Sequence, residues 1–305
     1  MNLKYILLTA LAFIIYIVAF SQDMPNEKQE FVYKSVDGHD IMATIYLPKS
    51  NEKTPVVIYF HGGGFMFGNR DQGIEDITIK KLVAAKIAVV SADYRLAPET
   101  KLEEILKDTR DIVRWIKVNG EAKFNVNTNK IAVAGGSAGG YLAISTGFDI
   151  GSAPNAIISI SAPTGFSTEG IQTGDLSLLK NIKKDKIVSH GDYSSRMDLW
   201  RFLGKEDLAL YEIFGFDPVK EPQKLNRYTL QSNIKSGYPP TLIIHSKNDH
   251  LVKLEEAKVF YNFLQDNKIE TELYVVENGH SSDLINQHPD SVDKIVTFLN
   301  KHFNK

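Results

Sequence analysis

The segment from Ile131 to Gly140 constrains the fold of this chain more than any other stretch. It begins with a short apolar run rich in β-branched residues, which is typical of a buried strand. A glycine-rich turn then carries Ser137 in the pattern Gly-x-Ser-x-Gly, and a helix-compatible apolar segment follows at residues 141–148. A serine in such a tight turn needs neighbours without bulky side chains. We therefore expect a strand-to-helix turn that projects the Ser137 hydroxyl and turns the helix N-terminal amides toward developing negative charge.

The rest of the chain alternates between expected strands and helices. At 305 residues it is long enough for one large α/β domain, and its apolar share of 43% is that of a globular protein with a full core. Alternation of this kind predicts a mostly parallel central sheet flanked by helices. The expected strands cover residues 31–36, 41–47, 55–60, 87–92, 131–135, 156–161, 241–246 and 271–276, and the expected helices include 74–86, 102–116, 257–264 and 292–303.

One segment, residues 163–240, interrupts this alternation. It contains no clear core strand, but it holds several aromatic residues and shows helical spacing around 194–203 and 206–214. A structureless loop of that length is implausible inside a compact domain. We interpret it as a lid-like helical insertion over the site, between core segments at residues 31–162 and 241–305.

Residues whose side chains can take part in catalysis follow four of the expected strands: His61, Ser137, Asp249 and His280. The carboxyl ends of parallel strands meet at one edge of a sheet, where such folds carry their sites. A serine hydroxyl is a weak nucleophile and needs a base, which in turn needs an orienting acid. The chain order Ser, Asp, His favours His280 as the base and Asp249 as the acid. Asp283 and Glu277 are reserve candidates for the acid.

The glycine run after His61 supplies a third component. Backbone N–H groups directed at a carbonyl oxygen stabilise the charge it acquires during acyl transfer, and glycines let the backbone approach a substrate closely. The expected donors of this oxyanion hole are the amides of Gly63, Gly64 and Ala138. We expect His61 to shape this loop and His245, inside a strand, to be a core residue.

Several other classes of chemistry are poorly supported. The net charge of −2 indicates no nucleic-acid surface, and the absence of cysteine excludes a thiolate metal site and a cysteine nucleophile. The glycine loop lacks the Gly-Lys-Ser/Thr of a phosphate-binding loop, and the histidines are too scattered for a metal site. We expect no cofactor and no metal.

The N-terminus has the pattern of an export signal. Lys4 precedes an almost wholly apolar run at residues 5–20, and a small-x-small site ends at Ser21. We expect a signal peptide at residues 1–21, a linker at 22–30 and an exported, periplasmic or extracellular protein. The alternative is an uncleaved membrane anchor.

Together, the motifs HGGGF at 61–65, DYRLAPE at 93–99 and GGSAGG at 135–140, with the late Asp249 and His280, resemble the hormone-sensitive-lipase-like branch of the α/β-hydrolases. The resemblance extends from about residue 31 to the C-terminus, except the insertion. It implies a cofactor-free carboxylic ester hydrolase that acts through an acyl-enzyme on short or medium acyl chains. It also implies that Arg95 and Glu99 form structural ion pairs.

The chain departs from that branch in having Gly136, where an aspartate often precedes the nucleophile, and in having little room for N-terminal cap helices. The departures bear on substrate preference. Export suits esterified external material, including acetylated carbohydrates. Phe65, Tyr141, Phe67 and the aromatic residues of the insertion are candidates to line an acyl pocket. Two alternatives remain open on the same fold: a ligand-binding protein without catalysis and a serine peptidase.

Overall fold

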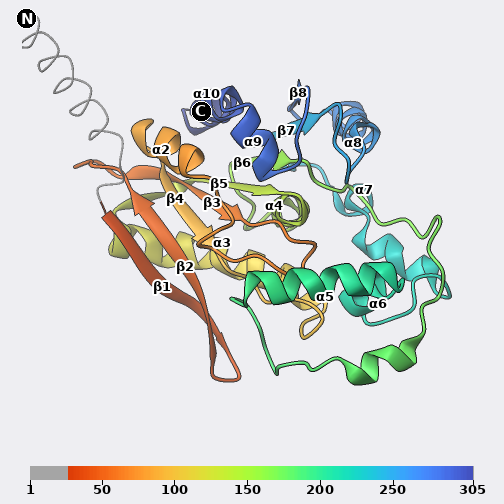
Figure 1. Ribbon diagram of the computed structural model, residues 1–305. Coiled ribbons are helices and arrows are strands. Elements are labelled where there is room, and N and C mark those ends of the chain that lie inside the picture. The colour runs from red at the N-terminus through yellow and green to blue at the C-terminus, as the bar shows by residue number, and fades with distance from the viewer. Residues whose placement is uncertain (1–26, 305) are drawn as a thin grey trace, which may run out of the picture.

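The computed structural model describes residues 27–304, so the expected signal peptide lies outside the described residues. An eight-stranded sheet runs through this part of the chain in the order β1-β2-β4-β3-β5-β6-β7-β8 (Figure 1). Of these strands only β2 runs against the others, because β1–β2 and β2–β4 pair antiparallel and every later pair is parallel. The strands are β1 (Glu27–Val36), β2 (His39–Leu47), β3 (Thr54–Phe60), β4 (Ala88–Ala92), β5 (Val126–Gly136), β6 (Ala156–Ile160), β7 (Thr241–Ser246) and β8 (Thr271–Val276).

Helices cover both faces of this sheet, which confirms the expected fold class. Successive residues of β3 alternate between two cores: Ile58 and Phe60 join one, whereas Val57 and Tyr59 join the other. This period of two is the geometry of a strand buried on both sides. The first core is completed by α3 (Leu102–Phe124), α4 (Ala138–Ser145) and α8 (Leu254–Asp266), and the second by α2 (Asp76–Ala84), α9 (Ser282–Gln287) and α10 (Asp290–Phe303).

The first strand begins earlier than its apolar residues suggest. Residues 27–30, which we expected to be linker, pair with residues 44–47 of β2 and so belong to β1. Most of these side chains are exposed at the edge of the sheet, so hydropathy does not reveal them.

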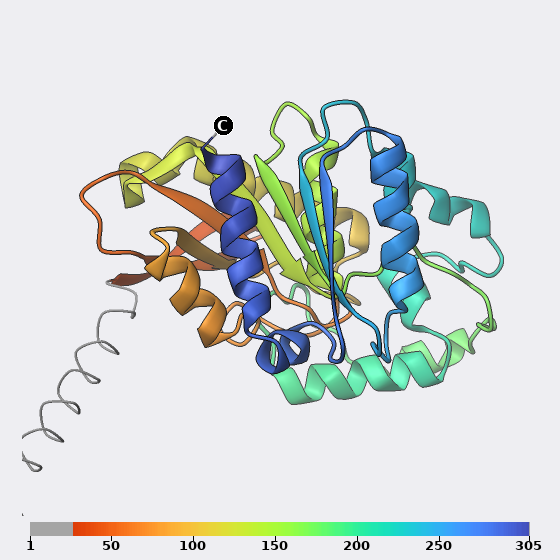
Figure 2. The ribbon, with the colours of Figure 1, turned by 90° about the horizontal axis from the view of Figure 1, so that it is seen from above.

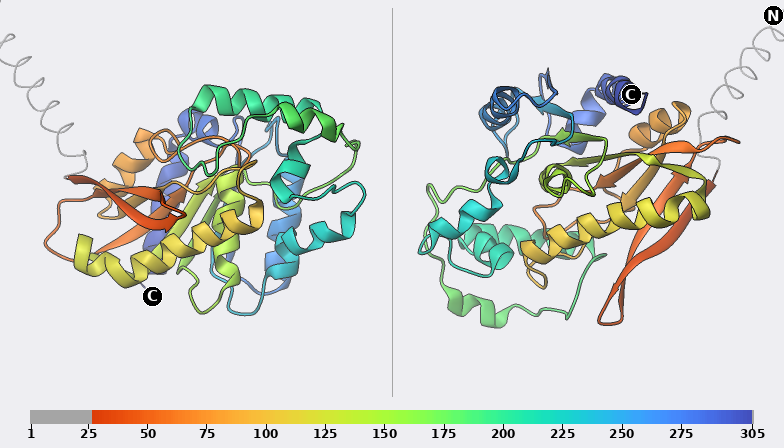
Figure 3. Two further views of the ribbon diagram at one scale, coloured as in Figure 1. Left: turned by 90° about the horizontal axis from the view of Figure 1, so that it is seen from below. Right: turned by 180° about the vertical axis from the view of Figure 1, so that it is seen from behind.

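The segment between β6 and β7 is helical, as its spacing indicated, and no strand occurs there among the described residues. It comprises η2 (Leu176–Asn181), α5 (Tyr193–Lys205), α6 (Ala209–Phe214), η3 (Pro222–Tyr228) and α7 (Leu230–Asn233), whereas the short η1 (Thr146–Phe148) follows α4 in the core. Leu203, Leu208 and Phe214 are buried in the first core, so the insertion packs firmly on the body of the protein. Figures 2 and 3 show α5 lying across one end of the sheet. Among residues 27–304, no helix combines the length and apolar character needed to cross a bilayer.

Candidate active site

Ser137 occupies a sharp turn between β5 and α4. Its backbone angles are φ 54° and ψ −123°, which place a non-glycine residue in the left-handed half of conformational space. The turn is tied to the next strand by the Ser137 amide, which donates to the Ile160 carbonyl at 2.8 Å. At Gly139 an added Cβ would lie 2.0 Å from the carbonyl oxygen of Phe60. The glycine therefore lets the turn pack directly against the end of β3.

Asp249 and His280 form a hydrogen-bonded pair at the ends of β7 and β8. Nδ1 of His280 lies 2.8 Å from Oδ2 and 3.0 Å from Oδ1 of the carboxylate. The amides of Leu251 and Val252 also donate to Oδ1, each at 2.9 Å. Burial acts to raise the pKa of Asp249, but the hydrogen bonds from His280 and the two amides outweigh it and lower the pKa to about 2. An ionised carboxylate holds the proton on Nδ1 and leaves Nε2 as the acceptor.

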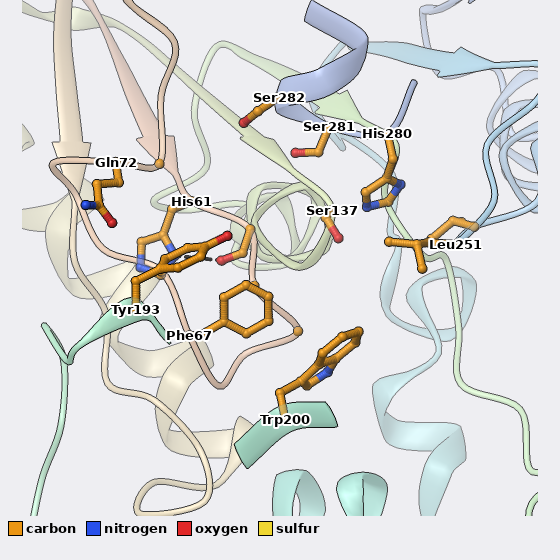
Figure 4. Close-up of a pocket in the computed structure, with 16 residues that line it drawn as sticks. His61, Phe67, Gln72, Ser137, Tyr193, Trp200, Leu251, His280, Ser281 and Ser282 are labelled. Atoms are coloured by element: carbon orange, nitrogen blue, oxygen red, sulfur yellow. Dashed lines mark hydrogen bonds between the residues drawn. The ribbon is translucent and has the colours of Figure 1, made fainter. Parts of the chain in front are cut away.

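Ser137 and His280 line one pocket of about 390 Å³. Figure 4 shows the Ser137 side chain beside the His280 ring. No hydrogen bond joins the two side chains within the described residues. Catalytic hydrogen bonds are often long without substrate and tighten in the complex, so the arrangement suits proton transfer from the serine to Nε2.

The glycine loop forms the opposite wall of this pocket. Gly63 and Gly64 have φ values of 108° and 56°, which glycine adopts without strain. In the described part of the chain neither amide donates a hydrogen bond, whereas the Gly63 carbonyl accepts from Met66 and Phe67 at 2.9 and 3.0 Å. Ala138 is the first residue of α4, where a helix has unpaired N–H groups. The three expected donors therefore have amides that can bind an oxyanion.

His61 holds this loop in place through ring stacking and hydrogen bonds. Its ring stacks on Tyr94 at a centroid distance of 4.2 Å, and the Tyr94 hydroxyl donates to its carbonyl at 2.8 Å. Nδ1 lies 2.7 Å from the Gly62 carbonyl, to which it donates when protonated. Burial lowers the pKa of His61, which favours the neutral ring. These contacts match the loop-shaping role that we predicted.

His245, which we expected in the core, and the two reserve acids have other hydrogen-bond partners. His245 is buried, and its Nε2 lies 2.9 Å from the Val252 carbonyl and 3.5 Å from Oδ2 of Asp249. It is thus a core residue that also supports the turn carrying Asp249. The carboxylates of the reserve acids Glu277 and Asp283 bond instead to Lys247 and Gln287, respectively.

The two residues expected to form ion pairs lie in the loop after β4. Arg95 donates to the buried carboxylate of Asp108 at 2.8 Å through both Nε and Nη2. Glu99 instead accepts from Arg196 of α5 at 2.8 and 2.9 Å. The loop is therefore bound to the core by one pair and to the insertion by the other.

The structure does not bring Phe65 and Tyr141 into the pocket. Both are buried, in edge-to-face contact at 5.7 Å, and the Tyr141 hydroxyl donates to the Tyr228 carbonyl at 2.6 Å. Both rings belong to the core on which the glycine loop and the insertion pack. The aromatic lining consists of Phe67 together with Tyr193 and Trp200 of the insertion.

Sequence reasoning missed a contact that explains Gly136. A Cβ added there would lie 2.1 Å from Oγ of Ser281, the residue after the base. Ser281 adopts φ 52° and ψ −118°, nearly the angles of Ser137. Its side chain thus fills the space where the related branch often has an aspartate. Two features of the sequence could have indicated this contact: Ser281 directly follows the base, and Gly136 stands where the related branch often has an aspartate. The polar residues Gln72 and Ser282 also line the pocket. Within residues 27–304, no cluster of three or more His, Cys, Asp or Glu side chains is placed to hold a metal ion.

The mostly parallel sheet, the serine turn at its carboxyl edge and the Asp–His pair beside it define an α/β-hydrolase. The chain belongs to the BD-FAE family, whose model matches residues 43–264. The expected α/β-hydrolase fold is thereby confirmed.

Among curated proteins, the non-reducing polyketide synthase ascC of Acremonium egyptiacum is 28% identical over 298 residues, which cover 83% of this chain but 14% of the synthase. Esterase LipI of Mycobacterium tuberculosis is 42% identical over 132 residues, 40% of each protein. The chain thus spans less than half the length of these relatives.

Solved structures share the fold over nearly the whole chain. An α/β hydrolase superfamily protein from Enterococcus faecalis has a TM-score of 0.70 at 20% identity, covering 90% of this chain and 99% of that one. The carboxylesterase EstE1 from a metagenomic library has a TM-score of 0.69 at 20% identity, covering 94% and 93%.

Proposed function

We propose that this chain is a serine carboxylic ester hydrolase. The observation that carries the proposal is the convergence of four chain segments on one pocket: the Ser137 turn, the loop of Asp249, the loop of His280 and the glycine loop. The names of LipI and EstE1, an esterase and a carboxylesterase, support it.

In the proposed reaction Oγ of Ser137 attacks the ester carbonyl carbon while Nε2 of His280 takes its proton. The carbonyl π electrons move onto oxygen, and the amides of Gly63, Gly64 and Ala138 stabilise that charge. When the tetrahedral intermediate collapses, the C–O bond breaks and the imidazolium protonates the leaving alkoxide. Water then repeats the sequence on the acyl-enzyme, with Asp249 orienting the ring throughout.

Short to medium acyl chains are the proposed substrates. The pocket volume of about 390 Å³ lies at the lower end of the usual range for small-molecule sites. Solved structures of Thermogutta terrifontis esterase 2, which shares the fold, hold butyrate or propionate. We further propose acetylated carbohydrates as substrates, because Gln72, Ser281 and Ser282 offer polar groups on the side of the pocket away from Trp200.

The first test is Ser137→Ala assayed with p-nitrophenyl acetate, with labelling by a fluorophosphonate. The proposal expects turnover and labelling in the parent protein and the loss of both in the variant, with unchanged circular dichroism. Undiminished turnover by the variant would remove Ser137 from the mechanism. A parent protein that is neither active nor labelled would favour a ligand-binding role, and cleavage of peptide amides in preference to esters would indicate a peptidase.

We also propose that the protein is exported, on the basis of the N-terminal pattern. Sequencing the N-terminus of the protein from its native host tests this. A start at Gln22 supports cleavage of a signal peptide, and an intact leader in the membrane fraction supports the anchor alternative.

A further inference from the structure

Helix α5 presents one face to the pocket. Tyr193, Arg196 and Trp200 are spaced at i, i+3 and i+7 and so lie on the same side of the helix. Tyr193 and Trp200 line the pocket and pack on either side of Phe67, at ring centroid distances of 5.3 and 5.5 Å. Figure 4 shows these three rings together below Ser137.

Arg196, between the two aromatic residues, binds the body of the protein with its whole guanidinium. Nη1 lies 2.8 and 2.9 Å from the two carboxylate oxygens of Glu99. Nε donates to the Met66 carbonyl at 2.8 Å, and Nη2 donates to the Ala97 carbonyl. The side chains of Arg196 and Glu99 are only 11% and 2% exposed. A planar fork of fixed donors suits this arrangement, whereas a lysine ammonium has no equivalent geometry.

These contacts join α5 to the loop that carries the expected oxyanion donors. Met66, which accepts from Arg196, donates its own amide to Gly63 at 2.9 Å. Trp200 lies against the same loop, since a Cβ added at Gly64 would be 2.5 Å from its Nε1. Arg196 therefore connects the helix that carries these aromatic residues to the glycine loop.

We propose that Arg196 is a positioning residue that holds α5 against the glycine loop as a fixed wall, and that Tyr193 and Trp200 on this wall limit the size of the acyl group that enters. The inference rests on the proposed ester hydrolysis. It differs from a mobile lid, because a buried ion pair with two additional carbonyl bonds does not open readily.

The kinetic test compares Arg196→Met with Arg201→Met, a matched control on the same helix whose side chain is 63% exposed and pairs only with Asp198 among the described residues. Both are assayed on p-nitrophenyl acetate, butyrate and octanoate. In Arg196→Met we expect KM for acetate to rise at least fivefold, kcat to change less than threefold, and the octanoate-to-acetate ratio of kcat/KM to rise at least fivefold. Arg196→Lys is expected to restore little of this, and Arg201→Met to match the parent. Unchanged KM and an unchanged chain-length ratio, with or without a fall in kcat, would overturn the proposal.

A second measurement does not depend on activity. The chain has two tryptophans, and Trp115 is partly buried and stacks on Phe31, so Trp115→Phe leaves Trp200 as the sole reporter. Acrylamide quenching of Trp200 is expected to increase at least twofold on adding Arg196→Met and to stay constant on adding Arg201→Met. Equal quenching in the two variants would refute the fixed wall. If Arg196→Met does not fold, Glu99→Gln, which keeps the shape but removes the charge, is expected to shift both readouts in the same direction. If the parent protein hydrolyses no ester, the proposed function fails and quenching alone decides the role of Arg196.

Discussion

Replacing Gly136 by alanine tests whether the loops of the nucleophile and the base are sterically coupled. The new Cβ would lie 2.1 Å from Oγ and 3.3 Å from Cβ of Ser281, and 3.2 Å from the hydroxyl of Tyr59. The φ angle of Gly136 is not in the left-handed region, so the backbone accepts alanine and only the contact is unfavourable. Rotation of the Ser281 hydroxyl relieves the closest clash but leaves the crowding at its Cβ.

We therefore expect Gly136→Ala to lower the free energy of unfolding by about 1–2 kcal/mol, in the lower part of the range for overpacked sites. Activity is expected to fall further, by about 10-fold or more in kcat/KM, because Ser281 adjoins His280 and small displacements of a catalytic group are costly. Urea denaturation and p-nitrophenyl acetate hydrolysis measure the two effects. Gly165→Ala is the control, since no atom lies within 4 Å of an added Cβ there.

The decisive variant combines Gly136→Ala with Ser281→Gly. Glycine tolerates the φ of 52° at position 281 and removes both crowded atoms. The double variant should recover about 1 kcal/mol or more relative to the sum of the single changes, and kcat/KM within about threefold of Ser281→Gly alone. A coupling energy below about 0.5 kcal/mol would show that the two loops do not interact as argued.

Three further predictions concern the ionisable side chains of Asp249, Asp108 and His190. Asp249→Asn should lower kcat by about 10³–10⁴-fold with the fold intact, because the ring loses its tautomer control; a loss below 10-fold would reject Asp249 as the acid. Asp108→Ala should cost about 3–5 kcal/mol in urea denaturation, because it leaves Arg95 buried without its carboxylate; a cost under 1 kcal/mol would contradict this. The hydrogen bond to Asp93 raises the pKa of His190, so its stabilisation is complete below the unfolded pKa of about 6.5 and is lost as pH rises through the higher folded value. His190→Asn should therefore destabilise the protein more at pH 5.5 than at pH 8.5, and the reverse order would refute the assignment.

The sheet was predictable because its central strands are buried on both faces. Residues 55–60 and 241–246 were expected as core strands, and β3 (Thr54–Phe60) and β7 (Thr241–Ser246) match those bounds to within one residue. The start of β1 at Glu27 was not, because an edge strand with exposed side chains has no hydrophobic signal. The expected parallel strands also predicted that the residues following them would meet at the carboxyl edge of the sheet. Asp249 and His280, 31 positions apart in the sequence, do form a hydrogen bond there.

Which of the candidate aromatic residues line the pocket could not be predicted. Phe65 follows the glycines directly and Tyr141 follows the nucleophile, so proximity in sequence favoured both, yet each is turned into the core. The wall comes from α5, whose position depends on a guanidinium reaching a carboxylate 97 residues earlier in the chain. Helical spacing shows that Tyr193 and Trp200 share a face with Arg196, but it does not show what that face meets. The aromatic pocket thus depends on a polar contact, because without Arg196 the helix has no comparable bond to the glycine loop among the described residues.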